Sequence, residues 1–317
     1  MQTSFWKDKH ILCTGGAGFL GSHLVPLLRA AGACVVAPRS CDYDLTDAGL
    51  VRRMFSEAFT CSIDMVFHLA ATVGGIGANA SRPADFYYRN TLMNCNVAEW
   101  ARKFEVGKFI GVGSVCAFPK FTPPPFREKC LWDGYPEETN AAYGTAKRGL
   151  LVHLQAMRQQ YGFNGIYLIP TNLYGPHDGA NLETSHVIPA LIRKIDEAQR
   201  AGLDTVEVWG TGAASRDFLY VKDCAEALML AAYRYNRADP VNLGSGQEIK
   251  IVGLIEMLKQ VMGFDGRFVF DGSRPDGQPR RVLDTSRAWE EFGWQATTKL
   301  EDGLRQTVEW WRGNGRE

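Results

Sequence analysis

A tyrosine and a lysine four positions apart form the first pair of residues that could do chemistry. Tyr143 and Lys147 lie in the segment YGTAK, and on a helix this spacing puts both side chains on one face. A cation beside a phenol favours the phenolate, lowers its pKa from about 10 and makes proton exchange with a hydroxyl or ketone feasible near neutrality. Ser114 follows the apolar run 108–112, so its hydroxyl is expected at the carboxyl edge of a sheet, where such folds hold their ligands.

A glycine-rich segment, TGGAGFLG at residues 14–21, predicts a turn that binds a dinucleotide. Gly15, Gly18 and Gly21 permit a tight turn, a close approach of the backbone to a pyrophosphate and close packing of the next helix. That helix would offer free N–H groups to the phosphates, with Phe19 and Leu20 beside them. A glycine triplet also marks ordinary turns, but the apolar run before it and the amphipathic stretch after it favour the dinucleotide site.

The chain after the second apolar run favours NADPH over NADH. An acidic residue there accepts hydrogen bonds from a free ribose 2′-hydroxyl and repels a 2′-phosphate, whereas this sequence reads VVAPRS with Arg39 at the tip. A guanidinium suits a phosphate, although Arg39 could also be a solvated surface residue. Asp44 and Leu45 are expected at the edge of the adenine, with a cap on a helix at 46–51 as the alternative role of Asp44. Further expected cofactor contacts are Leu69, Ala70 and Pro170.

The elements that must position these residues alternate between strand and helix. Short apolar runs are separated by stretches of helical periodicity, and such alternation implies βαβ units. We therefore predict an α/β fold with a doubly wound parallel sheet. The expected strands are 10–14, 34–37, 65–69, 108–112 and 165–169, and the expected helices are 22–31, 84–104 and 141–161.

The regular alternation loosens after Tyr174, which places a domain boundary near this residue. We predict a Rossmann domain that binds NADP over residues 1–173 and also receives 219–248. A smaller substrate-binding domain is predicted over 174–218 and 249–317. Its patterning, with that of the returning segment, predicts helices at 187–201, 223–235, 252–262 and 300–311, and strands at 206–209 and 241–243.

Composition and charge exclude several classes of protein. The 317 residues are 45% hydrophobic and 22% charged, which suits a large core and excludes disorder. Thirty-five basic and thirty-five acidic residues leave no net charge, so nucleic-acid and anionic-membrane binding are not expected. Eight cysteines without a CxxC pair indicate a reducing compartment and no metal site. Because no apolar stretch has the length of a signal peptide or a membrane span, we expect a cytoplasmic protein.

Segments along nearly the whole chain resemble one known family. The glycine-rich turn, Ser114 and the YGTAK segment, in this order, resemble the extended short-chain dehydrogenase/reductase superfamily. Further segments are similar to the GDP-L-fucose synthase family: VGGIGAN at 73–79, PADF at 83–86, SVC at 114–116, PTNLYGP at 170–176, SHVIPAL at 185–191, WGTG at 209–212, RDFL at 216–219 and PDGQPRR at 275–281. The resemblance implies a GDP-sugar 3,5-epimerase/4-reductase that acts on GDP-4-keto-6-deoxy-mannose with NADPH.

The resemblance also implies a role for each catalytic residue. Tyr143 would donate a proton to O4 as hydride reaches C4, Lys147 would hold the nicotinamide ribose, and Ser114 would hydrogen-bond the keto oxygen. Cys116 would remove the protons at C3 and C5, which the 4-keto group acidifies. His186 would supply a proton on the opposite face of the sugar and also contact the cofactor.

Structural roles stay open for some of these residues. Cys116 could be a packed thiol behind a buried strand, and His186 could be a helix cap or a surface residue. Arg216 suits the diphosphate of the nucleotide but could be an exposed arginine. His68, inside the apolar run VFHLAA, is interpreted as a core histidine.

The sugar is less constrained than the GDP class. The expected substrate contacts are Asn172, Lys194, Trp209, Arg216, Asp276 and Arg280. The chain departs from the family pattern at Thr72, where the family has a lysine, and at Arg193-Lys194, where it has two arginines; segments 131–135 and 178–184 also differ. Rival interpretations are a GDP-mannose 3,5-epimerase-like protein, an epimerase/reductase of a GDP-heptose or GDP-colitose precursor, and a non-catalytic nucleotide sensor.

Two of the expected helices also predict an oligomer. The helices at 84–104 and 141–161 carry large apolar residues on more than one face, and in the superfamily this pair packs against its copy as a four-helix bundle. We therefore expect a homodimer.

Overall fold

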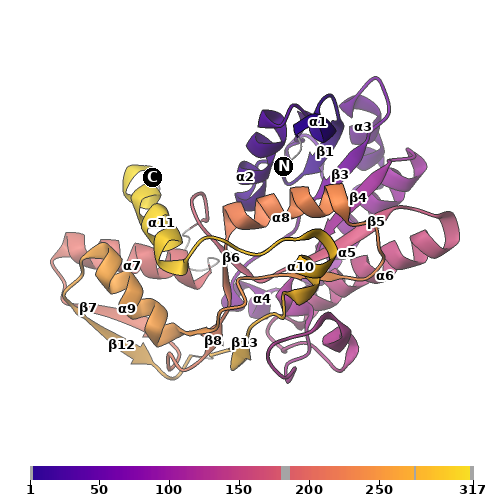
Figure 1. Ribbon diagram of the computed structural model, residues 1–317. Coiled ribbons are helices and arrows are strands. Elements are labelled where there is room, and N and C mark those ends of the chain that lie inside the picture. Colours follow the sequence, from indigo (N-terminus) through magenta and orange to yellow (C-terminus); the bar gives the residue numbers. More distant parts are fainter. Residues whose placement is uncertain (1–2, 180–185, 275, 315–317) are drawn as a thin grey trace.

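A six-stranded parallel sheet with helices on both faces is the largest part of the structure (Figure 1). The computed structural model describes residues 3–179, 186–274 and 276–314; Ser185, Pro275 and residues 180–184, which belong to segments discussed above, lie outside the described residues. The strand order is β10–β5–β4–β3–β1–β2, and every pair is parallel. The predicted fold class is thus confirmed. The strands are β1 (His10–Thr14), β2 (Cys34–Val36), β3 (Met65–His68), β4 (Lys108–Val112), β5 (Gly165–Pro170) and β10 (Val241–Leu243).

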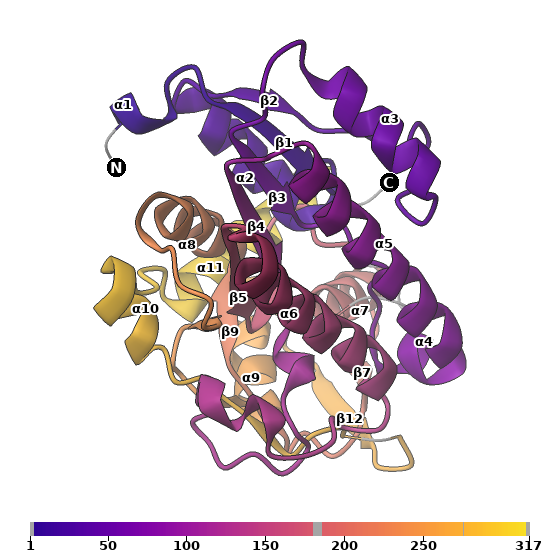
Figure 2. The same cartoon turned by 90° about the vertical axis from the view of Figure 1, so that its right-hand side faces the viewer.

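Two layers of helices cover the sheet. On one face lie α2 (Phe19–Ala30) and α8 (Val221–Arg234), and on the other lie α3 (Ala48–Ala58), α5 (Pro83–Lys103) and α6 (Ala141–Tyr161). Because both faces are covered, all residues of β3, β4 and β5 are buried. Figure 2 shows α5 and α6 side by side, so that the YGTAK segment at the start of α6 lies at one end of this pair.

The second half of the chain packs around a third apolar cluster, formed by α7, α9, α11 and the β7–β12 pair. The helices here are α7 (Val187–Ala201), α9 (Ile251–Met262), α10 (Ser286–Phe292) and α11 (Leu300–Asn314). The strands are β6 (Asn172–Tyr174), β7 (Thr205–Trp209), β8 (Ser215–Arg216), β9 (Phe218–Tyr220), β11 (Ile249–Lys250), β12 (Arg267–Asp271) and β13 (Arg280–Arg281). The N-terminal half also contains two short helices, α1 (Thr3–Trp6) and α4 (Ile76–Ser81), and two 3₁₀ turns, at Val115–Ala117 and Glu128–Trp132. Among the described residues, no helix is long and apolar enough to cross a membrane.

Asp217 is buried and joins segments from both halves of the chain through its carboxylate and its backbone carbonyl. Its Oδ1 accepts hydrogen bonds from the backbone N–H and the hydroxyl of Ser245, at 3.0 and 2.6 Å, and its Oδ2 accepts one from the N–H of Leu283 at 3.4 Å. Its backbone carbonyl accepts from Thr171 Oγ1 and Asn172 Nδ2, at 3.1 and 2.8 Å. Burial raises the pKa of Asp217 despite these bonds. The chain after β5, the loop after β10 and the chain after β13 therefore meet at one residue, the first at its backbone carbonyl and the other two at its carboxylate.

The alternative role of Asp44 as a helix cap is wrong. The helix expected at 46–51 is α3, and its cap is Asp47, whose carboxylate accepts from the N–H groups of Gly49 and Leu50. Asp44 instead accepts from the backbone and hydroxyl of Thr46, which is an Asx turn that leads into the helix.

Candidate active site

A cavity of about 1240 Å³ lies where β1, β3, β4 and β5 end, between the sheet and the second half of the chain. Ligands of open α/β sheets bind at this edge. All predicted site residues except Arg280 line the cavity: Gly15, Gly18, Phe19, Leu20, Gly21, Arg39, Asp44, Leu45, Leu69, Ala70, Ser114, Cys116, Tyr143, Lys147, Pro170, Asn172, His186, Lys194, Trp209, Arg216 and Asp276. Arg280 is exposed and pairs with Glu248 instead.

The glycine-rich turn leaves no room for side chains. A Cβ on Gly15 would lie 2.7 Å from the backbone nitrogen of Ala70. The φ of +72° at Gly15 also favours glycine over other residues. A Cβ on Gly21 would lie 2.5 Å from Gly16 Cα and closer still to the carbonyl oxygen of Gly15. The helix α2 begins directly after Gly18, so its first N–H groups lie at the cavity. This cradle fits a pyrophosphate.

The part of the cavity near the end of β2 contains the guanidinium of Arg39, and no acidic residue directly follows this strand. Arg39 and Ser40 line the cavity directly after this strand, and Asp44 and Leu45 lie further along. Hydrogen bonds from Thr46 hold the pKa of Asp44 below its usual value. These residue types fit a ribose that carries a 2′-phosphate.

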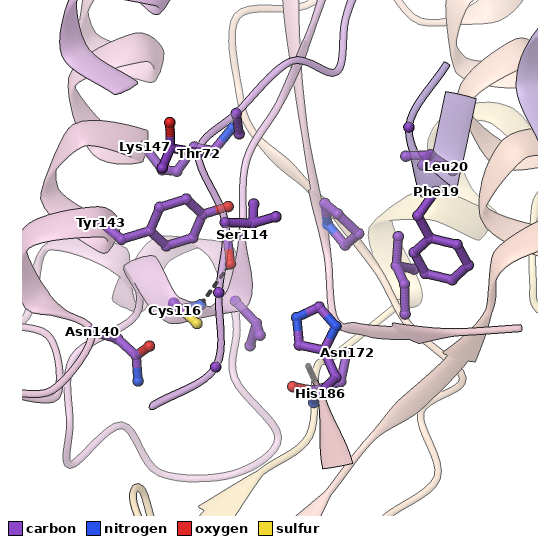
Figure 3. Close-up of a pocket in the computed structure, with 18 of the residues that line it drawn as sticks. Phe19, Leu20, Thr72, Ser114, Cys116, Asn140, Tyr143, Lys147, Asn172 and His186 are labelled. Carbon is purple, nitrogen blue, oxygen red and sulfur yellow. Dashed lines mark hydrogen bonds between the residues drawn. The ribbon is translucent and has the colours of Figure 1, made fainter. Parts of the chain in front are cut away.

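Ser114, Cys116 and Tyr143 share one side of the cavity, and His186, Phe19 and Leu20 lie across from them (Figure 3). Ser114 caps a 3₁₀ turn over Val115–Ala117 and accepts a hydrogen bond from the N–H of Cys116 at 3.2 Å. The Tyr143 hydroxyl points toward Ser114. Burial raises the pKa of Tyr143, and a hydrogen bond with Ser114 only partly offsets this. The phenol is therefore protonated near neutrality and can donate a proton.

Lys147 lies one helical turn after Tyr143 and is fully buried. Its Nζ donates to the carbonyl of Val112 at 2.9 Å and lies 5.8 Å from the centre of the Tyr143 ring. Burial lowers the pKa of Lys147 to about 8. The helix approaches the 3₁₀ turn so closely that a Cβ on Gly144 would lie 3.0 Å from the carbonyl carbon of Cys116. This contact brings the phenol and the ammonium beside the serine and the thiol.

The side chain of His186 lies next to a carboxylate that the sequence did not single out. His186 immediately precedes α7, but within the described residues its side chain makes no capping hydrogen bond to that helix. Its Nδ1 lies 3.7 Å from Asp178 Oδ1. The carboxylate of Asp178 raises the pKa of His186, whose side chain is 47% exposed to solvent at the edge of the cavity. The imidazolium form is thus favoured, as a proton donor requires.

The opposite end of the cavity is cationic and aromatic. Lys194 Nζ lies 5.4 Å from the ring centre of Trp209, and the guanidinium carbon of Arg274 lies 4.9 Å from the same centre. Arg216 is buried, so its interpretation as an exposed arginine is wrong. Burial, with the charge of Arg281, lowers the pKa of Arg216 to about 9. An aromatic ring beside several cations suits a base and a diphosphate.

Several residues that line the cavity were not predicted individually. Gln278 and Arg281 lie in the quoted PDGQPRR segment, so the segment was recognised but not the side chains that face the cavity. Arg274 precedes that segment, Arg89 comes from α5, and Asn140 precedes α6. The side chains of three of them contact predicted residues: Arg89 Nη2 lies 3.9 Å from Asp44 Oδ1, Arg281 contacts Cys116, and Arg274 lies over Trp209.

The interpretation of His68 as a core histidine is confirmed. It is fully buried, and its Nδ1 lies 2.7 Å from Thr14 Oγ1 while its Nε2 lies 3.1 Å from Asn94 Oδ1. Asn94 Nδ2 donates in turn to the carbonyl of Ala146, the residue before Lys147. Burial and the charge of Lys147 lower the pKa of His68 to about 3. Among the described residues, no three His, Cys, Asp or Glu side chains are grouped so that they could hold a metal ion.

Comparison with known proteins shows the family to which this chain belongs. A model of the NAD dependent epimerase/dehydratase family matches residues 11–244. The chain is 40% identical to the GDP-L-fucose synthase of Sinorhizobium fredii over 95% of each sequence. A solved GDP-L-fucose synthetase from Naegleria fowleri bound to NADP has a TM-score of 0.86 at 31% identity, with 98% of this chain and 95% of that chain covered. A GDP-6-OMe-4-keto-L-xylo-heptose reductase from C. jejuni has a TM-score of 0.89 at 27% identity, with 99% of each covered.

The fold, the cradle and the Ser–Tyr–Lys group therefore define an enzyme, and the chain belongs to the NAD dependent epimerase/dehydratase family. Within this family it belongs with the GDP-L-fucose synthases, as its full-length identity of 40% to one of them shows. The resemblance found in the sequence is thus confirmed.

Proposed function

We propose that this enzyme is a GDP-sugar 3,5-epimerase/4-reductase of the GDP-L-fucose synthase type, with NADP(H) as its cofactor. The observation that carries the proposal is one cavity with two sets of proton-transfer groups. Ser114, Tyr143 and Lys147 are suited to a ketone that is being reduced. Cys116 and His186 line the cavity from opposite sides. A sugar between them can lose a proton from one face and gain one on the other, as inversion at carbon requires (Figure 3).

Epimerisation uses the acidity that the 4-keto group confers on C3 and C5. The Cys116 sulfur takes the proton from the carbon, and the resulting negative charge moves to O4. The hydroxyls of Ser114 and Tyr143 stabilise that oxygen by hydrogen bonding. His186, whose protonated form the carboxylate of Asp178 favours, returns a proton from the opposite face.

Reduction follows at C4, and NADPH supplies the hydride. Tyr143 gives its proton to O4 as the hydride arrives, which requires the protonated phenol that burial favours. Lys147 would bind the nicotinamide ribose, and its Nζ lies 5.8 Å from the centre of the Tyr143 ring. Gly15, Gly21 and Arg39 hold the pyrophosphate and the 2′-phosphate, for which the turn and the end of β2 have the right shape and charge.

The GDP part of the substrate is assigned to the second half of the chain. Trp209 offers a ring face for the guanine, Lys194 and Arg216 offer positive charge to the diphosphate, and Asn172 and Asp276 line the space around them. Arg280 is not included, because it lies outside the cavity.

A GDP-heptose reductase is the second candidate. The heptose reductase from C. jejuni covers 99% of this chain with a TM-score of 0.89. Thr72, which stands where the GDP-L-fucose synthase family has a lysine, lines the cavity, so the sugar end differs from the family pattern at a position that faces the ligand.

A panel of GDP-4-keto sugars tests both candidates. The protein is incubated with NADPH and each sugar in deuterated buffer, and the products are identified by NMR. We expect deuterium at C3 and C5 and a reduced C4 with the 4-keto-6-deoxy sugar. Products from the heptose substrate alone would support the second candidate, and no turnover of any GDP-4-keto sugar would contradict the proposal.

Two substitutions separate the two half-reactions. Tyr143→Phe should slow NADPH oxidation by about two to four orders of magnitude, the usual contribution of a general acid, and should spare exchange at C3 and C5. Cys116→Ser should abolish that exchange and leave NADPH binding intact, because a serine hydroxyl is a far weaker base. Wild-type exchange in Cys116→Ser would mean that the thiol is structural and the protein a simple ketoreductase.

We also propose a cytoplasmic homodimer with the domain division given above. All eight cysteines are free thiols in the structure, as suits a reducing compartment. The paired helices expose Tyr87 and Tyr88 on α5 and Val152 and Tyr161 on α6. Large apolar side chains on adjacent exposed helices are typical of an interface. No nucleic-acid or membrane partner is proposed.

A further inference from the structure

The two arginines of β13 have opposite surroundings. Arg280 is exposed, and its Nη2 pairs with Glu248 Oε2 at 2.6 Å. Arg281 is buried, lines the cavity, and donates from Nη1 to the sulfur of Cys116 at 3.6 Å. Successive strand residues point to opposite faces, which explains the difference. A permanently charged donor therefore contacts the thiol that we propose as the base for epimerisation.

The guanidinium of Arg281 is held in place from behind. Its Nε donates to Gln278 Oε1 at 3.1 Å, and Gln278 Nε2 donates to the carbonyls of Pro119 and Lys120 at 3.1 and 2.9 Å. Both side chains are buried, with 6% of Arg281 and 2% of Gln278 exposed. β13 and the turn before it are thus joined to the loop after Cys116 through this pair, and the direction of the Arg281 guanidinium is fixed.

Other charged and titratable groups face Cys116 from neighbouring elements. Arg216 on β8 is paired in register with Arg281 and interacts electrostatically with the thiol. Tyr143 on α6 also interacts with it, and a negative sulfur raises the pKa of that phenol. Glu137 acts on Arg216 from the loop before α6. Within the part of the chain that the structure describes, the residue that donates directly to the sulfur atom is Arg281.

We propose that Arg281 is a positioning residue that favours the thiolate of Cys116 and orients it toward the sugar ring. This inference rests on the proposed function, in which Cys116 is the base. The thiol first releases its proton to solvent, and the thiolate then takes the proton from C3 or C5 and becomes a thiol again. The electron pair of the broken C–H bond moves into the enolate and onto O4. Arg281 keeps its proton throughout.

Alkylation of Cys116 by iodoacetamide tests the inference without any sugar substrate. Only the thiolate reacts, and the reagent is neutral, so the rate reports the thiolate fraction and its accessibility. Tryptic cleavage after Lys108 and Lys120 yields the peptide 109–120, whose single cysteine is Cys116. Mass spectrometry of this peptide follows the reaction in the full-length protein from pH 6 to pH 9.

Three variants give the comparison. Arg281→Gln removes the charge and should slow alkylation at pH 7 by about tenfold, the effect of one lost hydrogen bond to a charged group, and should move the pH profile upward. Arg281→Lys keeps the charge and should restore part of the rate. Arg280→Gln changes the adjacent residue of the same strand, which does not touch the thiol, and should react at the wild-type rate.

Equal rates in Arg281→Gln and the wild type would overturn the inference, whether or not the enzyme acts on GDP-4-keto sugars. NADP⁺ binding by each variant shows that it is folded. If Arg281→Gln does not fold, the variant Gln278→Met is used instead. It removes the hydrogen bond that holds the guanidinium of Arg281 and keeps the positive charge of Arg281. We then expect alkylation about threefold slower, and an unchanged rate would overturn the inference equally. In turnover, Arg281→Gln should lower kcat for C3 and C5 exchange more than it changes KM.

Discussion

Replacing Gly21 with alanine should displace the glycine-rich turn and weaken NADPH binding. The new Cβ would lie 2.5 Å from Gly16 Cα and 2.6 Å from its carbonyl carbon. Carbon atoms pack at about 3.5 Å or more, so the turn must move by about 1 Å. Movement is limited on the other side, because Gly15 lies against the backbone of Ala70. Losing one hydrogen bond to a phosphate costs about 1.5–3 kcal/mol, which predicts a 10- to 100-fold higher Kd.

Calorimetric titration with NADPH measures this effect, and a second glycine provides the control. A Cβ on Gly253, in the first turn of α9, would lie 3.4 and 3.6 Å from side-chain atoms of Ile249, which are ordinary contacts. Gly253→Ala should bind NADPH as the wild type does and be equally or slightly more stable, because alanine favours a helix over glycine by up to about 1 kcal/mol. Wild-type affinity in Gly21→Ala would refute the assignment of the pyrophosphate to this turn.

Three further expectations concern cofactor choice, stability and assembly. Arg39→Ala should raise the KM for NADPH and leave that for NADH unchanged, and equal use of both cofactors by the wild type would contradict the role of Arg39. Folding holds His68 neutral with a pKa of about 3, below its unfolded value of about 6.5, so stability should fall as the pH drops through this range. Urea titration should show a loss of about 2 kcal/mol from this group between pH 7 and pH 5, absent in His68→Gln. Light scattering should give twice the chain mass of 35.2 kDa, and a monomer at micromolar concentration would exclude the homodimer.

The sequence predicts an element well where its boundaries carry local signals. The strand at 108–112 and the helix at 187–201 have in the structure the bounds that their patterns predict, because Gly113 and Gly202 end them. The helix expected from residue 22 begins at Phe19 instead, since its first turn contains Gly21, which periodicity alone does not assign to a helix. β13 was not predicted, because two residues show no alternation.

Some residues of the site could be predicted from local motifs, whereas others depend on contacts between distant segments. Motifs pointed to the glycine turn and to the residues that we propose as catalytic, and these line one cavity. β13 decides which of Arg280 and Arg281 faces the cavity, and its register is set by pairing with β8. The sequence argument also expected a lowered pKa at Tyr143, whereas burial raises it. The burial of Tyr143 depends on all the elements around the cavity, so the YGTAK segment alone does not predict it.

The junction at Asp217 has a consequence for how such proteins can be recombined. Its hydrogen-bond partners lie on both sides of residue 174, at Thr171, at Ser245 and at Leu283. A chimaera that took only residues 219–248 from a relative would separate the Asp217 carboxylate of this chain from Ser245, whose hydroxyl and N–H donate to it. Such an exchange would leave the buried carboxylate without a donor wherever the relative has no hydroxyl at this position. The segments that meet at Asp217 therefore have to be exchanged together, although the apolar clusters of the two halves are separate.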